Sequence, residues 1–214
     1  MARDPKYPAY WWDDTVIKKL PDIPVEYPAQ GKFSWEVLPS EAGEGEVILS
    51  KRNELGLLSN FAATPFEYKG KRYASVEGFW QMMLYPEGPA GDPNDPRNAP
   101  SVKWKYTREQ VGQMVALDAK GAGDLAQKNL TKLGIDWVSF DGRRFPYRMS
   151  PGQLGLHYQL IVDAMRAKLE QNPQVRDVLL KTGDLKLKPD HHPEEGAPDE
   201  WNYFDLWMAM RGKL

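Results

Sequence analysis

A glutamate set among apolar residues is the first candidate for chemistry in this sequence. Glu77 follows Ser75, a typical helix N-cap, and Val76, Phe79 and Trp80 recur around it at helical spacing. Desolvation by apolar neighbours raises the pKa of a carboxyl, whereas a helix N-terminus and nearby cations lower it. A carboxylate in such a mixed environment suits general acid or base catalysis. The structural alternative is that Glu77 bonds back to the start of its helix as a cap.

Residues just before this segment are candidates for holding a ligand. Lys51 and Arg52 follow an expected strand over 47–49, and cations at a strand end are suited to bind a phosphate. Asn60 lies in the loop that follows, where its amide would either contact a ligand or form an Asx turn that stabilises the loop. The sequence leaves these alternatives open.

Two other groups of residues have a chemical interpretation and a structural one. His191-His192 lies among acidic residues, but adjacent side chains diverge, so chelation by both histidines requires an unusual backbone. We therefore expect no bound metal. Arg143-Arg144 flanks an expected hairpin turn and has aromatic neighbours, so it would either clamp a phosphate and stack a base or form an exposed hairpin tip.

Composition excludes several classes of function. The 214 residues include no cysteine, which excludes disulfides, thiolate zinc sites, iron–sulfur clusters and a cysteine nucleophile. The formal net charge of −2 gives no global attraction to nucleic acid or to an anionic membrane, so any nucleic-acid contact would be local. Neither a signal peptide nor an apolar run of the ~18 residues needed to span a bilayer is evident. We expect a soluble, cytoplasmic protein without a membrane partner.

The pattern predicts a helix-rich α+β fold in one domain over 46–214, preceded by an arm over 1–45. The arm is rich in proline and aromatic residues, which argues for an irregular segment packed on the body, because exposed aromatic side chains are costly. Hairpins are expected around Gly70 and Asp141-Gly142. Helices are expected over 76–85, 108–119, 124–133, from about Ser150-Pro151 to Gln171, 174–181 and 202–211.

The segment from Leu58 to Gln81 resembles the signature of the NADAR, or YbiA-like, family. It combines a Ser59-Asn60-Phe61 loop, a hairpin with a glycine turn, and Ser75-Val76-Glu77 entering a helix that carries Trp80-Gln81. Later segments also resemble the family: the helix at 157–172, the Leu-Leu-x-Thr-Gly at 179–183 and the terminal Trp-Met-Ala-Met-Arg at 207–211. The resemblance extends from about Val47 to Leu214 and omits the arm.

The resemblance implies an N-glycosidase of YbiA-like fold. Members cleave a ribose C1–N bond in riboflavin-pathway nucleotides or remove ADP-ribose from guanine, so a nucleotide or an ADP-ribosylated base is the implied partner. Glu77 matches the catalytic glutamate by position, and the substrate site would include Asn60, Phe61, Trp80 and Gln81. Such chemistry requires proton transfer and charge stabilisation at an anomeric carbon, for which no metal and no cofactor is needed.

The sequence also departs from the family pattern. Gly78 stands where the family usually has histidine, Leu84 stands where it usually has lysine, and the Trp-Gly-Asp-Gly loop is not intact. The nearest counterpart contains Trp201 as a stacking residue and Asn202 after it, with Asp199 or Asp205 replacing the missing aspartate. Alternatively, Trp201 and Trp207 belong to the core. These departures keep a second hypothesis open, a non-catalytic nucleotide- or ADP-ribose-binding or interaction module.

Overall fold

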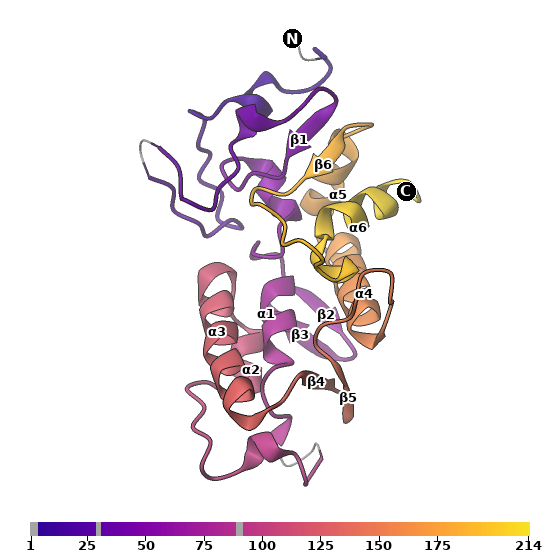
Figure 1. The fold of residues 1–214 in the computed structure, drawn as a ribbon. Helices are drawn as coiled ribbons and strands as arrows, with labels where there is room; N and C mark the ends of the chain where they lie inside the picture. Colours follow the sequence, from indigo (N-terminus) through magenta and orange to yellow (C-terminus); the bar gives the residue numbers. More distant parts are fainter. Residues whose placement is uncertain (1–3, 29–30, 89–91) are drawn as a thin grey trace.

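The computed structural model describes residues 4–28, 31–88 and 92–214, and within them the chain forms a helix-rich α+β fold, as predicted. Figure 1 shows the short strands as separate pairs distributed among the helices. The helices are α1 (Val76–Met82), α2 (Arg108–Gly112), α3 (Ala116–Leu133), α4 (Leu156–Gln171), α5 (Pro173–Lys181) and α6 (Tyr203–Arg211). The strands are β1 (Glu46–Ile48), β2 (Phe66–Tyr68), β3 (Lys71–Tyr73), β4 (Trp137–Phe140), β5 (Arg143–Pro146) and β6 (Lys186–Lys188).

Helix α1 is central to the fold. It lies between α3 and α4 (Figure 1), contacts α2 as well, and buries all of its residues. Gly78 permits the close approach to α2, because a Cβ at this position would lie 2.5 Å from the Met114 carbonyl oxygen and 2.9 Å from that of Val111. No larger side chain fits there unless the 111–114 segment moves. The glycine that departs from the family pattern is thus a packing requirement of this chain.

The continuous helix predicted over 108–119 is wrong, because the helix is interrupted: α2 ends at Gly112 and α3 begins at Ala116. The break leaves the Met114 carbonyl free to accept a hydrogen bond from the Ser75 hydroxyl at 2.8 Å. It also turns the Ala116 N–H toward the Phe61 carbonyl at 3.2 Å, with Ala116 at a positive φ of 47°. These contacts tie the break to the start of α1, and α3 then continues to a Gly134 cap with φ 64°.

Both predicted hairpins are present, β2–β3 and β4–β5, with antiparallel register. The strand predicted at 47–49 is β1, and it pairs in parallel with β6, a strand that the sequence analysis did not predict. Val47 and Leu187 are register partners, and both are fully buried. The pairing brings the segment before the candidate glutamate next to the C-terminal region.

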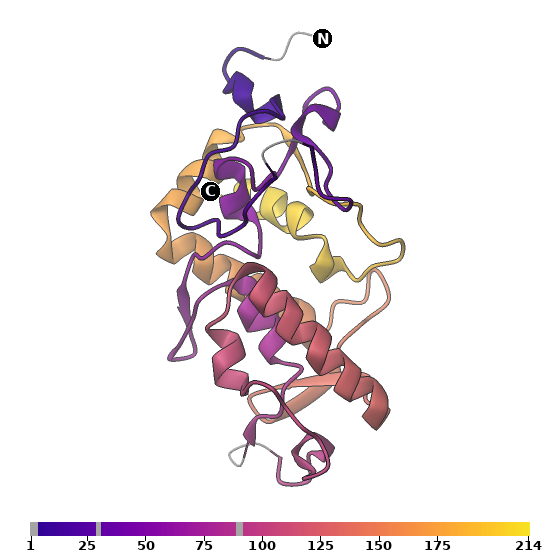
Figure 2. The ribbon, with the colours of Figure 1, turned by 90° about the vertical axis from the view of Figure 1, so that its left-hand side faces the viewer.

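The arm contributes side chains to the hydrophobic core. Trp11 is completely buried, and its indole N–H donates to the Glu54 carboxylate at 3.0 Å, while Ile23 is also part of the core. Figures 1 and 2 place the described arm residues at the end of the molecule that holds β1 and β6. The boundary between arm and domain at residues 45 and 46 stays a prediction.

Candidate functional site

The carboxylate of Glu77 forms a hydrogen bond within its own helix, α1. Ser75 caps α1 by accepting from the Gly78 N–H at 2.9 Å. The Glu77 carboxylate instead accepts from the Gln81 side-chain amide at 2.8 Å, and the Glu77 N–H donates to the Asn60 carbonyl at 2.9 Å. The capping interpretation of Glu77 is therefore wrong, because its side chain is bound by Gln81, one turn along the helix.

Burial raises the pKa of the Glu77 carboxyl above its ordinary value, and the side chain is nearly inaccessible to solvent. The Gln81 hydrogen bond opposes this rise, as do the positive charges of Lys120 and Lys51, while Asp124 adds to it. Lys120 is itself paired with Asp124 at 2.7 Å on the exposed face of α3. A buried carboxyl with a raised pKa and cations within electrostatic reach is the usual environment of a catalytic acid or base.

Gln81 is fixed by close packing against α3. A Cβ on Gly123 would lie 1.8 Å from the Gln81 amide oxygen, a distance that no packed structure tolerates. The missing side chain at Gly123 is thus what leaves room for the Gln81 amide. With its oxygen held there, the amide nitrogen is directed at Glu77.

An aromatic cluster lies beside Glu77, built from segments far apart in the sequence. Trp80 meets His157 edge to face at 5.2 Å between ring centroids and meets Trp201 in the same way at 6.3 Å. Tyr147 lies 5.5 Å from His157 and 6.2 Å from Trp201. We call Trp80, Tyr147, His157 and Trp201 the aromatic cluster. Tyr147 and Trp201 are its partly exposed members, and partly exposed aromatic rings can stack a planar base.

Polar atoms of this region lack partners in the described structure. The indole N–H of Trp201, the Nε2 of His157 and the side-chain oxygen of Asn60 are buried without a hydrogen bond. Buried polar atoms are normally paired, so several unpaired ones near one buried carboxyl indicate a site for a polar ligand.

Tyr147 and a buried pair complete the cluster. Burial raises the pKa of Tyr147 to about 12, the negative charge of Glu77 adds to the rise, and the nearby Trp80 indole opposes it. The phenol is therefore neutral and within electrostatic reach of Glu77. His157 is oriented by Glu200, whose carboxylate lies 2.9 Å from Nδ1, and both side chains are buried.

Two buried side chains donate hydrogen bonds to backbone carbonyls of the loop that precedes the first hairpin. Trp207 donates its indole N–H to the Leu58 carbonyl at 2.6 Å, and Lys168 donates to the Ser59 carbonyl at 2.7 Å. Burial lowers the pKa of Lys168 to about 7. These bonds fix the backbone that presents Asn60 to Glu77, so Trp207 supports the site from the core.

The two predicted phosphate-binding cations differ in their surroundings. Lys51 forms a buried ion pair with Asp190, and its ammonium lies 5.2 Å from the ring of Phe61. Arg52 is bound in a two-point ion pair with Glu36, at 2.6 and 2.9 Å, and is turned into the arm. Both cations are therefore engaged in buried ion pairs, and that of Arg52 serves the packing of the arm.

Of the C-terminal candidates, Trp201 reaches the aromatic cluster, whereas the two aspartates have other surroundings. Trp201 joins the aromatic cluster, and Asn202 follows it at the junction with α6. The Asp199 carboxylate accepts from the Gly152 N–H at 3.0 Å. Burial raises the pKa of Asp205, which lies near Lys186 and Lys188. These contacts give both aspartates partners outside α1, and their catalytic role stays a prediction.

The remaining sequence candidates have structural partners. His191 stacks on Tyr203 at 6.3 Å and lies beside Asp190. Within residues 4–28, 31–88 and 92–214, no group of three or more histidine or acidic side chains is placed to hold a metal ion. Arg144 pairs with Asp92 at 2.6 Å on the surface.

None of the helices in the described residues is long and apolar enough to cross a membrane.

Sequence reasoning missed the His157–Glu200 pair, and it named Tyr147 only as an aromatic neighbour of Arg143-Arg144 in a hairpin that could stack a base. The sequence assigned His157 to the packed stripe of a helix and Tyr147 to a hairpin end. The signal that distinguishes them is their convergence on Trp80, which depends on how β5 and α4 pack.

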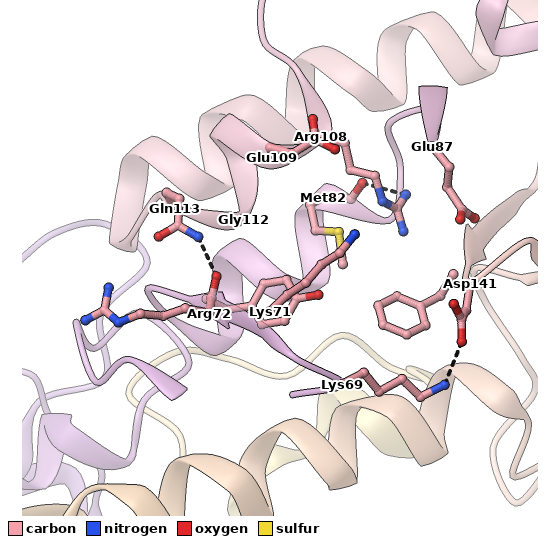
Figure 3. A pocket seen from close by; sticks show the side chains of 12 residues that line it. Lys69, Lys71, Arg72, Met82, Glu87, Arg108, Glu109, Gly112, Gln113 and Asp141 are labelled. Atoms are coloured by element: carbon pink, nitrogen blue, oxygen red, sulfur yellow. Dashed lines mark hydrogen bonds and ion pairs between the residues drawn. The ribbon is translucent and has the colours of Figure 1, made fainter. Parts of the chain in front are cut away.

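A cavity of about 350 Å³ lies elsewhere, near the C-terminal end of α1. Figure 3 shows that Lys69 pairs there with Asp141, while the Arg108 guanidinium donates to backbone carbonyls, including that of Met82 at 3.1 Å. Lys69 and Arg108 are thus already engaged, and none of the predicted site residues lines the cavity.

Comparison with known proteins does not assign the chain to a family. No family model matches the chain, and no curated protein matches it. Among solved structures, the chain is similar to the NMR structure of the E. coli protein YbiA, with 20% identity and a TM-score of 0.43, over 75% of this chain and 79% of that chain. Function must therefore be argued from the side chains of this molecule.

Proposed function

We propose that the chain is an N-glycosidase that hydrolyses the ribose C1–N bond of a nucleotide or of an ADP-ribosylated guanine, with Glu77 as the catalytic carboxylate. The observation that carries the proposal is the buried Glu77 carboxyl, oriented by Gln81 and raised in pKa, next to an aromatic cluster that has unpaired polar atoms on His157 and Trp201. The resemblance of residues 58–81 to a family of N-glycosidases supports the same reaction.

The proposed reaction follows from these groups. Ionised Glu77 accepts a proton from a water molecule as the water oxygen bonds to C1. The C1–N electron pair passes to the base nitrogen, and protonated Glu77 returns the proton to the departing base or to solvent, which restores the enzyme. Positive charge at C1 is stabilised by the carboxylate, and the aromatic cluster stacks and hydrogen-bonds the base.

The activity should be detected as free base released from a panel of purified N-ribosides. The panel contains purine and pyrimidine nucleoside monophosphates, a ribosylamino-pyrimidine phosphate and ADP-ribosylated guanine. Because the ionised form of Glu77 is required and its pKa is raised, the rate should fall with acidification at a higher pH than for an ordinary glutamate. A folded protein that releases no base from any member contradicts the proposal.

The panel also tests the alternative of a binding module. Saturable binding of ADP-ribose or a nucleotide without turnover would favour that alternative, for which the altered Trp-Gly-Asp-Gly region is the specific observation. Turnover that requires Glu77 would exclude it.

Gly123→Ala should lower the rate of base release by about tenfold or more, and should move the acid limb of the pH profile to higher pH. The added Cβ displaces the Gln81 amide, and its hydrogen bond is one of the influences that lower the pKa of Glu77. The matched control is Gly121→Ala on the same helix, where a Cβ meets no atom within 4 Å. Equal pH profiles for the two variants would show that Gln81 does not position Glu77.

A further inference from the structure

The cavity near the C-terminal end of α1 has the lining of a second binding site. Its volume of about 350 Å³ lies within the range of small-molecule pockets. Helix α1, helix α2 and both hairpins contribute to the lining, so the body of the fold encloses the cavity without the arm. Neither Glu77 nor any member of the aromatic cluster lines it. A ligand in this cavity would therefore bind apart from the site proposed for hydrolysis.

Arg108 contributes a buried cation whose charge no carboxylate neutralises. Its guanidinium donates to the carbonyls of Met82 at 3.1 Å, Tyr85 at 2.8 Å and Ser139 at 2.7 Å. A guanidinium has five N–H donors, so these bonds leave two N–H groups, one of them on Nε, without an acceptor among the described residues. Burial lowers the pKa of Arg108 to about 10. Buried charges are normally paired, and the described chain supplies no such pair for this guanidinium.

Lys71 provides a second cation at the same cavity. It lies on β3 with its side chain exposed, and within residues 4–28, 31–88 and 92–214 its ammonium forms neither a hydrogen bond nor an ion pair. Figure 3 shows the Lys71 side chain directed toward Met82 and Arg108. Lys69, in the turn of the same hairpin, is instead paired with Asp141 at 2.9 Å. The Lys71 ammonium is therefore available to bind an anion.

The carboxylates that line the cavity do not neutralise these two cations. Asp141 already has its own lysine partner, and Glu87 accepts from the Gly142 N–H at 3.0 Å. Glu109 is exposed on α2. The charge of Glu87 acts on Arg108, but no carboxylate of the described residues forms an ion pair with the guanidinium. The lining has four basic and three acidic side chains, so the excess charge is positive and favours an anionic ligand.

Aromatic and apolar side chains form another part of the wall. Tyr73, Met82 and Phe140 line the cavity, and each of them is almost fully buried. Tyr73 is packed closely against α2, because a Cβ on Gly112 would lie 3.3 Å from its ring. The Phe140 ring packs against Phe79, with 5.5 Å between ring centroids, which fixes it in the core. Fixed aromatic side chains beside free cations suit a planar group that carries a negative charge.

We propose that this cavity is a second ligand site, which binds a small molecule with a planar aromatic ring and a carboxylate or phosphate group. The anionic group lies between Lys71 and the free N–H groups of Arg108, and the ring packs against Met82 and Phe140. An inorganic anion would leave the apolar wall in contact with water, so it should bind more weakly than a ligand that covers this wall. The site does not involve Glu77 and is independent of the proposed hydrolysis.

Titration calorimetry of the full chain at pH 7 tests the proposal with four probes. Benzoate and phenyl phosphate carry both the ring and the anion, inorganic phosphate carries only the anion, and benzyl alcohol carries only the ring. At least one aromatic anion should bind saturably with one-to-one stoichiometry. Each single-feature probe should bind at least about tenfold more weakly, because burial of a ring and pairing of a charge are each worth more than about 1.4 kcal/mol. The comparison of benzoate with phenyl phosphate distinguishes a carboxylate from a phosphate ligand.

Lys71→Glu should weaken binding of the aromatic anion by about tenfold or more, because it places a like charge beside the bound group. The matched control is Lys128→Glu, which makes the same change of charge at an exposed position of α3 outside the cavity. The control should bind as the wild type does. Both positions are exposed, so both variants should also melt as the wild type does.

The outcomes are distinct. Selective loss of affinity in Lys71→Glu, with Lys128→Glu unchanged, supports the site. The proposal is overturned if no aromatic anion binds saturably, or if both charge variants lose affinity equally. Binding that Lys71→Glu leaves intact also overturns it, because the probe then occupies another part of the molecule, such as the region of Glu77. Equal affinities for phenyl phosphate and inorganic phosphate would overturn the role of the aromatic wall.

Discussion

Glu77→Gln should lower the rate of base release by roughly 10²- to 10⁴-fold, the usual cost of losing a positioned general base. The amide conserves the size of the side chain, and it retains an oxygen that can accept from Gln81, whose hydrogen bond to Glu77 is 2.8 Å long. It cannot accept the proton of the attacking water. The rate is measured as released base under single-turnover conditions, with Glu170→Gln on the exposed face of α4 as the control.

The same substitution should not destabilise the protein at neutral pH. Burial raises the pKa of Glu77 in the folded state, so the folded protein binds a proton more tightly there than the unfolded chain does. The resulting stability is present below the unfolded pKa of about 4.3 and is lost as the pH rises through the folded value. At pH 7 burial of the ionisable carboxyl therefore costs free energy, and the amide removes that cost.

Melting curves across pH test this expectation. Glu77→Gln should unfold at the same or a higher temperature than the wild type at neutral pH, and any advantage should disappear in acid, where both side chains are neutral. A variant that is inactive and also clearly less stable at neutral pH would indicate a structural role for Glu77. The catalytic assignment would then fail.

Local pattern was sufficient to predict the elements that carry Glu77. Ser75 is the cap expected from its residue type, the apolar spacing of 76–80 produced a buried helix, and both turn signals produced hairpins. These features depend on neighbours within a few residues, which is the range over which capping and periodicity act.

Non-local contacts were not predictable in the same way. Strand β6 has only three residues and exists through its pairing with β1, far earlier in the chain. The break before Ala116 is stabilised by Ser75 and Phe61, not by residues inside the segment that breaks. Sequence pattern predicts a continuous helix wherever tertiary hydrogen bonds of this kind are not visible.

In the candidate site, too, residues with a local sequence signal were predictable and residues placed by non-local contacts were not. Glu77 could be selected from its position in a helix, because its apolar neighbours are adjacent in sequence. His157 and Glu200 form their pair across the fold, at 2.9 Å, and neither has a local signal. Arg52 was chosen for its position at a strand end, but its guanidinium is turned to Glu36 by an arm whose path the sequence did not define.

Trp11→Ala should destabilise the protein by about 3–5 kcal/mol, the usual cost of removing a fully buried tryptophan side chain. Trp11 is completely buried, stacks on Tyr7 with centroids 6.1 Å apart, and donates to Glu54 at 3.0 Å. For a chain of this size, the loss corresponds to a melting temperature lower by roughly 6–20 °C. Urea unfolding at pH 7 measures the free energy directly.

Trp12→Ala is the matched control, because this neighbouring tryptophan is only half-buried and packs at the edge of the core. It should cost clearly less than Trp11→Ala, although it loses a hydrogen bond of 2.9 Å to the Glu46 carbonyl. If both variants unfold within about 0.5 kcal/mol of the wild type, the range of ordinary surface substitutions, the arm adds little to the core. A large and selective effect at Trp11 would instead show that the arm folds cooperatively with the body.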